Sequence, residues 1–226
     1  MKIHAIVFDF DGLMVDTESA WYEAFRQAFR PYGYELPIEE FALCVGTYNE
    51  VLFDHLRKNR QLFFSNEEIM KEIERVHHQL LQNVELREGV LDYLRTAKQL
   101  GLKIGLATSS GRDWVEGWLK RFNLLDAFDA IKTSEDVTRI KPDPELYQAA
   151  VSALKADPGK TVAFEDSKNG LQAALGAGLH AVAVPNPVTS HLDFEGHALR
   201  LDSMADMPFT QVIQIISSSH QMASLF

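Results

Sequence analysis

Two aspartates at the end of a short apolar run are the first residues whose types and spacing could do chemistry. Asp9 and Asp11 follow the run IHAIVF at residues 3–8, and Gly12 comes directly after them. In an extended segment, residues two positions apart point the same way, so the two carboxylates would lie close together. Like charges held this close are costly unless a cation neutralises them or one group is protonated. The pattern taken alone is also typical of a solvated turn, so its meaning depends on what accompanies it.

Three further polar segments occur later in the chain, and each either follows an apolar run or precedes a predicted helix. They supply hydroxyls, a lysine and a pair of acids, in that order: Thr108 and Ser109, then Lys141, then Glu165 with Asp166. Each segment taken singly has an ordinary explanation, as a turn, a surface lysine or a helix cap. Together they provide carboxylate oxygens for a metal ion, and a cation and donors for phosphoryl oxygens. The combination predicts a Mg²⁺–phosphoryl site.

The apolar runs before these residues predict the strands that position them. The runs are continuous rather than alternating, which favours strands buried on both faces, as in a parallel sheet covered by helices. We expect strands at residues 3–8, 103–107, 130–133, 161–164 and 180–184. Helical patterns lie between them, so repeated βαβ units and a doubly wound α/β fold are predicted. In such open sheets ligands bind at the carboxyl ends of the strands, which is where the polar segments fall.

A helical insertion interrupts this rhythm after the first strand. Helical patterns without a credible strand occupy residues 18–30, 38–45, 49–59 and 66–83. Ser65 and Glu68 have the spacing of a capping box at the start of the last of these helices. We therefore expect a sheet domain of residues 1–16 and 87–226, and a helical cap of residues 17–86.

The composition argues against several classes of protein. The 226 residues include 22 basic and 32 acidic side chains, and the net charge of −10 disfavours nucleic-acid and anionic-membrane partners. No apolar run approaches the roughly 18 residues needed to span a bilayer. The first apolar run is broken by Asp9 and Asp11, unlike a signal peptide, and Cys44 as the only cysteine permits no intrachain disulfide. We expect a cytoplasmic monomer.

Four motifs identify a resemblance to a known family. DFDGLMVDTE, LATSSG, KPDPELY and FEDSKNG resemble, in this order, the four motifs of the haloacid dehalogenase (HAD) superfamily. More narrowly, the chain is similar to the beta-phosphoglucomutase-like phosphatase branch over residues 3–190. The resemblance implies a Rossmann-like core, a C1-type helical cap, and Mg²⁺-dependent phosphoryl transfer through an aspartyl phosphate.

The resemblance also implies a role for each motif residue. Asp9 would attack phosphorus, and Asp11 would protonate the leaving alkoxide and then deprotonate the hydrolytic water. Thr108 and the Ser109 backbone N–H would hold the phosphoryl oxygens. Lys141 would bridge the nucleophile and the phosphoryl group, offsetting charge in the transition state.

The implied cofactor is Mg²⁺, and the implied partner is a small phosphorylated metabolite, such as a sugar phosphate or a similar phosphomonoester. The metal ligands would be one Asp9 oxygen, the Asp11 carbonyl and Asp166. Glu165 would be either a further ligand or a residue that orients the ligands without touching the metal.

Three positions separate the chain from other branches of the superfamily. Asp11 favours phosphate esters, because the dehalogenases attack carbon and lack an acid there. The true mutases place a histidine and an arginine in the cap, where this chain has Trp21 and Asn49. Without the arginine, the cap lacks a bidentate partner for a second phosphate, which favours hydrolysis over a phosphosugar mutase reaction. A phospho-accepting receiver domain, the non-enzymatic alternative, is much shorter and lacks a helical cap.

The cap residues set the substrate, and the sequence says least about them. Trp21 is as compatible with packing inside the cap as with contact to the leaving group. We expect the following residues to face the leaving group: Thr17, Trp21, Gly46, Thr47 and Asn49.

Other aromatic and histidine residues have a structural interpretation. Trp114, Trp118 and Phe122 recur at helical spacing, which predicts packing of one helix face. Adjacent His77 and His78 point to different faces of a cap helix, so they do not predict a metal pair.

Overall fold

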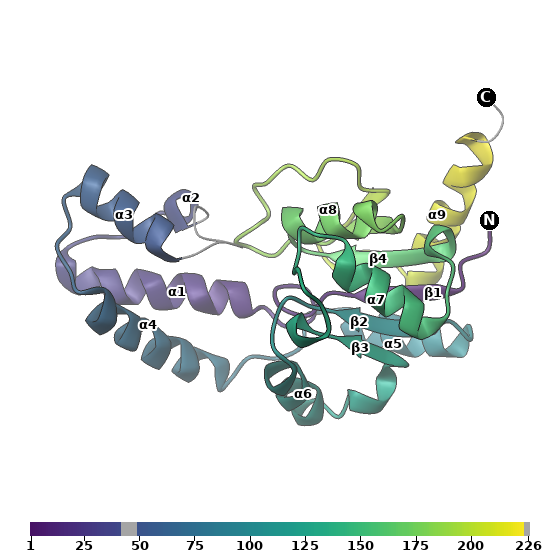
Figure 1. Ribbon diagram of the computed structural model, residues 1–226, viewed down its shortest axis with the longest axis horizontal. Helices are drawn as coiled ribbons and strands as arrows, with labels where there is room; N and C mark the ends of the chain where they lie inside the picture. Colours follow the sequence, from purple (N-terminus) through teal and green to yellow (C-terminus); the bar gives the residue numbers. More distant parts are fainter. Residues whose placement is uncertain (42–48, 224–226) are drawn as a thin grey trace.

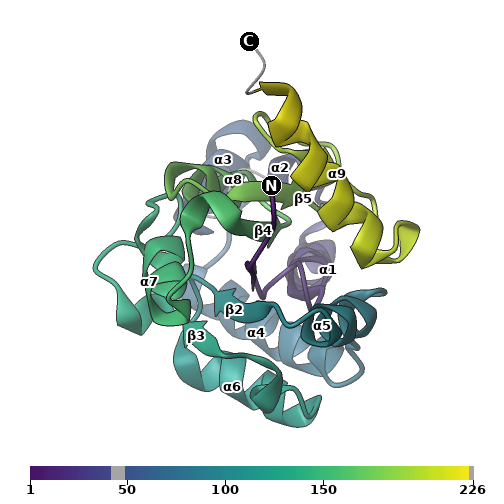
Figure 2. The ribbon, with the colours of Figure 1, turned by 90° about the vertical axis from the view of Figure 1, so that its right-hand side faces the viewer.

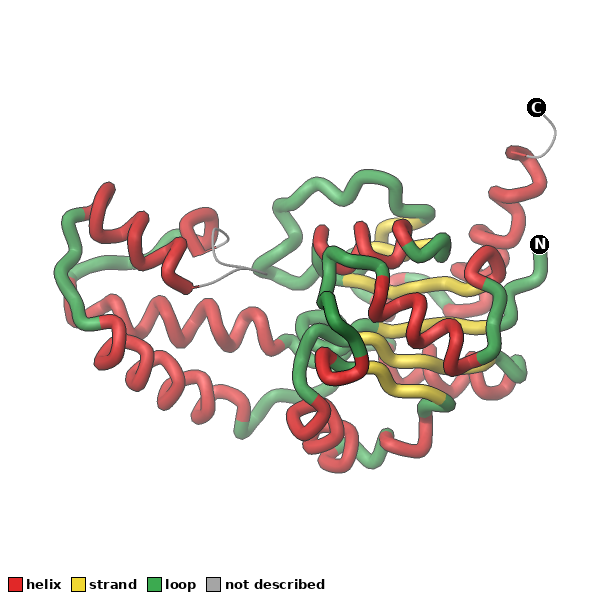
Figure 3. Tube along the Cα trace, viewed as in Figure 1, coloured by secondary structure: helices red, strands yellow, loops and turns green. Residues whose placement is uncertain are grey.

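The computed structural model describes residues 1–41 and 49–223, and one parallel β-sheet lies at its core (Figure 1, Figure 3). Within these residues the strand order is β3-β2-β1-β4-β5-β6, and all five neighbouring pairs are parallel. The strands are β1 (Ala5–Phe8), β2 (Lys103–Ala107), β3 (Ala130–Lys132), β4 (Thr161–Glu165), β5 (His180–Ala183) and β6 (Leu199–Arg200). The expected doubly wound α/β fold is confirmed.

Helices cover both faces of the sheet (Figure 2), and the side chains of β1 alternate between the two faces. Ile6 and Phe8 pack with α5, α6 and α9, whereas Ala5 and Val7 pack with α7 and α8. All four side chains are fully buried, which accounts for the uninterrupted apolar run. These helices are α5 (Val90–Gln99), α6 (Arg112–Arg121), α7 (Glu145–Leu154), α8 (Lys168–Gly176) and α9 (Phe209–Ala223).

The helices that follow β1 and precede α5 form a cluster of their own beside the carboxyl edge of the sheet (Figure 1). They are α1 (Thr17–Phe29), α2 (Ile38–Phe41), α3 (Asn49–Arg60) and α4 (Asn66–Leu81). Their buried side chains, such as Phe25, Phe53 and Ile73, make a hydrophobic cluster separate from those of the sheet. Ser65 caps α4 as its sequence indicates, because its hydroxyl accepts from the Glu68 N–H at 3.4 Å.

The two connections to this cluster run side by side. Val15 and Leu86 form an antiparallel bridge, and the Arg87 N–H donates to the Met14 carbonyl at 2.9 Å. The Arg87 guanidinium donates to three carbonyls of the sheet domain, at distances of 2.6 to 3.1 Å: Gly12, Val184 and Pro185. The helical cluster is thereby anchored beside the loop that follows Asp9. Its boundaries at residues 17 and 86 stay a prediction.

The C-terminal part holds elements that the apolar runs do not reveal. β6 is only two residues long, and α9 closes one face of the sheet with Phe209, Val212 and Ile216.

Short 3₁₀ helices lie at Arg30–Tyr32, Leu125–Ala127, Ser134–Asp136, Pro158–Lys160 and Met204–Asp206. None of the helices in the described parts of the chain combines the length and hydropathy that a membrane crossing requires.

Candidate active site

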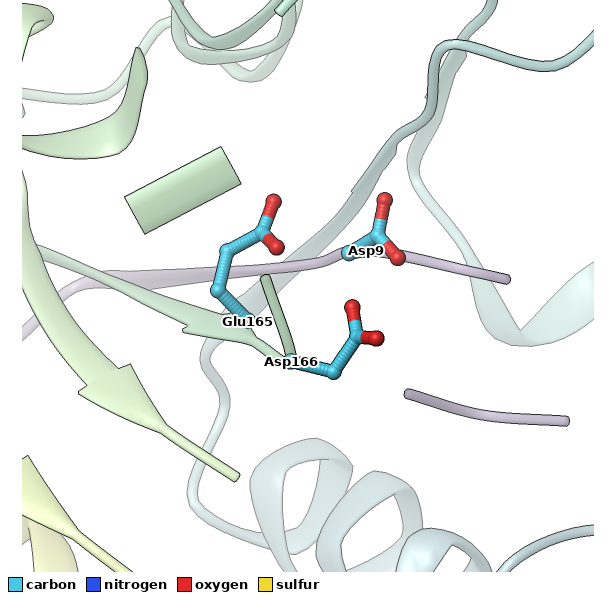
Figure 4. Close-up of side chains that lie close together, drawn as sticks. All are labelled: Asp9, Glu165 and Asp166. Atoms are coloured by element: carbon cyan, nitrogen blue, oxygen red, sulfur yellow. The ribbon is translucent and has the colours of Figure 1, made fainter. Parts of the chain in front are cut away.

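Parallel pairing brings the predicted acids together at the carboxyl edge of the sheet. Asp9 directly follows β1, and its N–H donates to the Phe164 carbonyl of β4 at 3.1 Å. Glu165 ends β4 and Asp166 follows it, so these side chains lie beside Asp9 (Figure 4). The three residues are 6%, 0% and 2% exposed, respectively, and their nearest carboxylate oxygens lie within 4.8 Å of one another.

Thr108 and Ser109 stand one strand away on the other side of β1. Thr108 directly follows β2, is buried, and donates its N–H to the Lys132 carbonyl at 3.0 Å. Its hydroxyl accepts from the Ser110 N–H at 3.1 Å, which tightens the turn. Ser109 is half-buried at the same edge. The turn therefore lies next to Asp9, as the strand order requires.

Lys141 reaches this cluster from the loop between β3 and α7. Its Nζ atom makes an ion pair with Asp9 and another with Glu165, the latter at 2.6 Å, and its side chain is only 6% exposed. Burial opposes the charge, but the two carboxylates outweigh it and raise the pKa of Lys141 above its ordinary range. The ammonium therefore stays charged between the two acids.

The cluster holds more negative charge than Lys141 can balance. Burial raises the pKa of Asp166 well above its ordinary value, and the neighbouring Asp9 and Glu165 raise it further. With all groups ionised, three carboxylates and one ammonium leave two negative charges in excess. A divalent cation would neutralise that excess, and carboxylate oxygens are the ligands that Mg²⁺ prefers. The residues present thus fit a magnesium ion.

The hydrogen bonds distinguish Glu165 from Asp166. Glu165 Oε1 accepts from Lys141 at 2.6 Å and from the Tyr147 hydroxyl at 2.5 Å, and Oε2 accepts from Ser167 at 3.3 Å. Both oxygens of Glu165 are therefore already engaged. Among the residues that the structure describes, the Asp166 carboxylate accepts only from Asn186, at Oδ2 and 2.7 Å.

Two glycines leave room for these carboxylates. A Cβ atom on Gly170 would lie 2.0 Å from the Glu165 carboxylate, and one on Gly12 would lie 2.2 Å from Asp166 Oδ2. Gly12 also has a φ of +80°, a left-handed conformation that favours glycine. Both positions in the motifs DFDG and FEDSKNG are therefore restricted by contact with an acid.

Asp11 points away from this cluster and toward the helices. Its Oδ1 accepts from Thr17 at 3.0 Å and from the Trp114 indole at 2.9 Å, and its Oδ2 accepts from the Ser110 hydroxyl at 2.5 Å. The side chain of Asp11 is thus separate from the three-acid cluster, and it lies where α1 and α6 meet the sheet edge.

A cavity of about 330 Å³ opens next to Asp11, between the helical cluster and the sheet domain. Thr17 and Trp21, two of the residues expected to face the leaving group, line it. Asn49 instead starts α3 and donates to the Met70 sulfur at 3.6 Å, and it is absent from the described lining. Gly46 and Thr47 lie outside the described residues.

Five further cavity residues were not among the site residues expected from the sequence: Glu18, His77, Ser110, Gly111 and Trp114. Burial, followed by repulsion from Asp11 and Asp16, raises the pKa of Glu18 to about 7. The aromatic stripe packs against the core of the sheet domain as predicted, and Trp114 in addition donates its indole N–H to Asp11. The position of Trp114 in the first turn of α6, directly after the LATSSG motif, is the signal that could have indicated this.

Comparisons with known proteins agree with the fold and with the four motifs. Residues 6–184 match the family of haloacid dehalogenase-like hydrolases. A putative phosphatase, YhcW of Bacillus subtilis, is 40% identical over 219 residues, which is 96% of this chain and 100% of the relative. The chain therefore belongs to the haloacid dehalogenase-like hydrolase family.

Other relatives are named for activity on phosphorylated compounds. The phosphorylated carbohydrates phosphatase of Thermotoga maritima is 31% identical, with 80% of this chain and 84% of the relative covered. Hexitol phosphatase B of Escherichia coli is 33% identical over 82% of this chain and 85% of the relative. The crystal structure of CbbY from Rhodobacter sphaeroides in complex with phosphate is 30% identical, with a TM-score of 0.70 over 90% of this chain and 96% of that one.

Proposed function

We propose that this protein is a phosphatase that hydrolyses a phosphomonoester of a small metabolite, a sugar phosphate or a similar compound. The observation that carries the proposal is the buried Asp9 carboxylate, paired with Lys141 at the open edge of the sheet. Relatives named as phosphatases of phosphorylated carbohydrates and hexitols support the substrate class. A panel of phosphorylated metabolites, scored by the phosphate released, tests it.

Asp9 and Asp11 divide the reaction between them. A carboxylate oxygen of Asp9 forms a bond to phosphorus while the bond from phosphorus to the leaving oxygen breaks. Asp11 gives its proton to that oxygen, and the alcohol departs. Asp11 then takes a proton from water, which attacks the aspartyl phosphate and restores Asp9 as inorganic phosphate leaves.

Lys141, Thr108 and Ser109 would hold the phosphoryl group during both steps. The Lys141 ammonium lies against Asp9 and so stands next to the oxygens on which charge accumulates. The Thr108 side chain and the Ser109 N–H follow the neighbouring strand and supply further donors. Glu165 has both oxygens engaged and acts by holding Lys141 in place.

A Mg²⁺ ion would be held by Asp9, the Asp11 carbonyl and Asp166. When bound, it neutralises the excess negative charge of the cluster and polarises a phosphoryl oxygen. The Asp166 Oδ1 atom is available for this purpose, because among the described residues only Asn186 donates to this carboxylate, and it does so at Oδ2. We further propose that residues 17–86 act as a cap over the site and that Thr17 and Trp21 contact the leaving group. The cytoplasmic location and the monomeric state stay predictions.

Chelation is expected to abolish phosphate release from an aryl phosphate, and added Mg²⁺ is expected to restore it. The reason is the repulsion within the cluster of Asp9, Glu165 and Asp166, which a divalent cation relieves. Mg²⁺ should also raise the melting temperature of the chelated protein, measured by circular dichroism. Full turnover in excess chelator would contradict the metal assignment.

The nearest alternative is a phosphosugar mutase. One solved structure with a TM-score of 0.74 and 26% identity is described as a putative beta-phosphoglucomutase from Thermotoga maritima. A mutase must hold a sugar bisphosphate tightly while the cap stays closed. Asn49, at the position of the mutase arginine, offers only neutral hydrogen bonds, and the described lining of the cavity contains no lysine or arginine.

We therefore expect free phosphate to form faster than glucose 6-phosphate when beta-glucose 1-phosphate is supplied with a trace of the bisphosphate. Both products are measured in the same reaction. Glucose 6-phosphate accumulating faster than phosphate would favour the mutase and direct attention to Trp21 and Asn49.

A further inference from the structure

The loop that follows β5 holds Asp166 at two points. The Asn186 amide donates through Nδ2 to Asp166 Oδ2, and the Thr189 hydroxyl donates to the Asp166 carbonyl, both at 2.7 Å. Asn186 and Thr189 are each 1% exposed, so water does not compete for these hydrogen bonds. At its start, the loop is fixed by the Arg87 guanidinium, which donates to the Pro185 carbonyl at 2.7 Å. A single buried loop therefore fixes both the side chain and the main chain of Asp166.

The loop also determines which way the Asn186 amide faces. Its Oδ1 atom accepts from the N–H groups of Val188 and Thr189, at 2.9 and 3.0 Å. A backbone N–H can only donate, so the amide oxygen must face the loop and the NH₂ group must face Asp166. A Cβ atom on Gly12 would lie 2.6 Å from Asn186 Nδ2, so the chain packs closely over this amide. Asn186 is therefore a fixed donor, and the Asp166 oxygen opposite it is the acceptor.

The hydrogen bonds within the three-acid cluster limit the oxygens that a metal ion could use. Lys141 contacts Asp9 at Oδ1. Asn186 occupies Oδ2 of Asp166, and both oxygens of Glu165 accept hydrogen bonds. Within the described parts of the chain, no group donates to Asp9 Oδ2 or to Asp166 Oδ1. Asp9 and Asp166 can therefore each offer one unengaged oxygen.

That supply of oxygens suits Mg²⁺ better than Ca²⁺. Mg²⁺ requires a nearly ideal octahedron, keeps several waters, and is commonly bound by one or two carboxylates together with a substrate phosphate. Ca²⁺ takes about six to eight oxygens at longer distances and often uses both oxygens of one carboxylate. A carboxylate whose second oxygen is held by an amide denies Ca²⁺ that additional ligand.

We infer that Asn186 is a positioning residue that makes the proposed metal site selective: it leaves Asp166 a single available oxygen and thereby favours Mg²⁺ over Ca²⁺. The inference rests on the Mg²⁺ site of the proposed function and adds the basis of its selectivity. Asn186 acts through the orientation of Asp166, not by contact with the metal ion.

Asn186→Ser tests the inference because it removes the donor and keeps the turn. A serine hydroxyl can accept from the Thr189 N–H, as serine commonly does in turns, but its side chain is too short to reach Asp166. The protein is first stripped of metal with a chelator. Its affinities for Mg²⁺ and Ca²⁺ are then measured by competition with Mn²⁺, which also binds octahedral oxygen sites and whose unbound form is followed by electron paramagnetic resonance.

We expect the Mg²⁺ affinity of Asn186→Ser to fall about tenfold, the usual effect of removing a group that orients a metal ligand. The Ca²⁺ affinity should fall by less than about threefold, because the freed Oδ2 atom of Asp166 supplies a further oxygen to the larger ion. The ratio of the two affinities, which a merely structural role would not alter, should therefore shift toward Ca²⁺ by at least about threefold.

Thr161→Val is the matched control, because it also removes one buried hydrogen bond. Thr161 is fully buried and starts β4, at the end of the strand away from Asp166, and its hydroxyl donates to the Asp157 carbonyl at 2.8 Å. This variant should lower the melting temperature but leave both metal affinities, and hence their ratio, unaltered.

An unchanged Mg²⁺ affinity or an equal loss for both ions in Asn186→Ser would overturn the inference. Should Asn186→Ser fail to fold by circular dichroism, the unaltered protein still decides, because it should bind Ca²⁺ no more tightly than Mg²⁺, and the opposite order would overturn the inference as well. An unaltered protein that binds none of the three ions would instead contradict the Mg²⁺ assignment of the proposed function. The two failures are therefore distinguishable.

Discussion

Asp9→Asn is expected to reduce phosphate release to background. An amide neither attacks phosphorus nor binds Mg²⁺ as a carboxylate does. The side chain is nearly isosteric, and the change removes one charge from a cluster with an excess of two, so the fold should survive. Turnover of an aryl phosphate and the melting temperature should be measured on the same preparation.

Asp193→Asn serves as the control, because Asp193 is exposed and lies outside the site. It should behave as the unaltered protein does. Retention of more than about a tenth of the activity by Asp9→Asn, a barrier change of only about 1.4 kcal/mol, would rule out covalent catalysis by this residue.

Lys141→Met should lower kcat by at least about a hundredfold, the effect of losing a donor aimed at developing charge. It should also destabilise the protein, because it leaves Asp9 and Glu165 buried without their cation.

Burial already raises the pKa of Asp9 from 3.8 to about 8 with Lys141 present. A group with a raised folded-state pKa contributes stability at low pH that is lost as the pH rises through that pKa. In chelator, Lys141→Met should therefore lower the melting temperature, relative to that of the unaltered protein, by more at pH 8 than at pH 5.

Lys160→Met is the matched control. Lys160 pairs with Asp157 at the opposite end of β4, and its side chain is 44% exposed. We expect normal kcat and a pH dependence of the melting temperature like that of the unaltered protein. A Lys141→Met variant with near-normal kcat would show that Lys141 has a structural role only.

The centre of the sheet was predictable because burial on both faces leaves a direct trace in the sequence. β1, β2 and β4 are runs of apolar residues, and each ends abruptly at a polar motif. β6 was not predictable, since its two residues, Leu199 and Arg200, pair only at the edge of the sheet. The tail helix α9 depends on long-range contacts with Tyr93 and Phe164, which local patterns do not reveal.

The candidate active site likewise has one part that the sequence predicted and one part that it did not. Asp9, Glu165 and Asp166 were predicted to converge because strand ends of a parallel sheet share one edge. The part that touches the leaving group depends on how α1 and α4 pack against each other and against α6. Helical periodicity assigns Trp114 to the same face as Trp118, but it does not show that this face reaches beyond the sheet edge to Asp11. The stacking of Trp21 on His77 joins residues 56 positions apart, and no local pattern encodes it.

The bridge between Val15 and Leu86 has a consequence for how such a protein can diversify. Because the chain leaves and re-enters the sheet domain through two adjacent segments, the intervening residues resemble a cassette held at both ends. Insertion, deletion or exchange within the cassette would leave the strand order and the residues around Asp9 intact. Recombination could therefore replace the surface that recognises the alcohol while the machinery that cleaves the ester is inherited unchanged. For protein engineering, the natural points of exchange lie just inside this bridge.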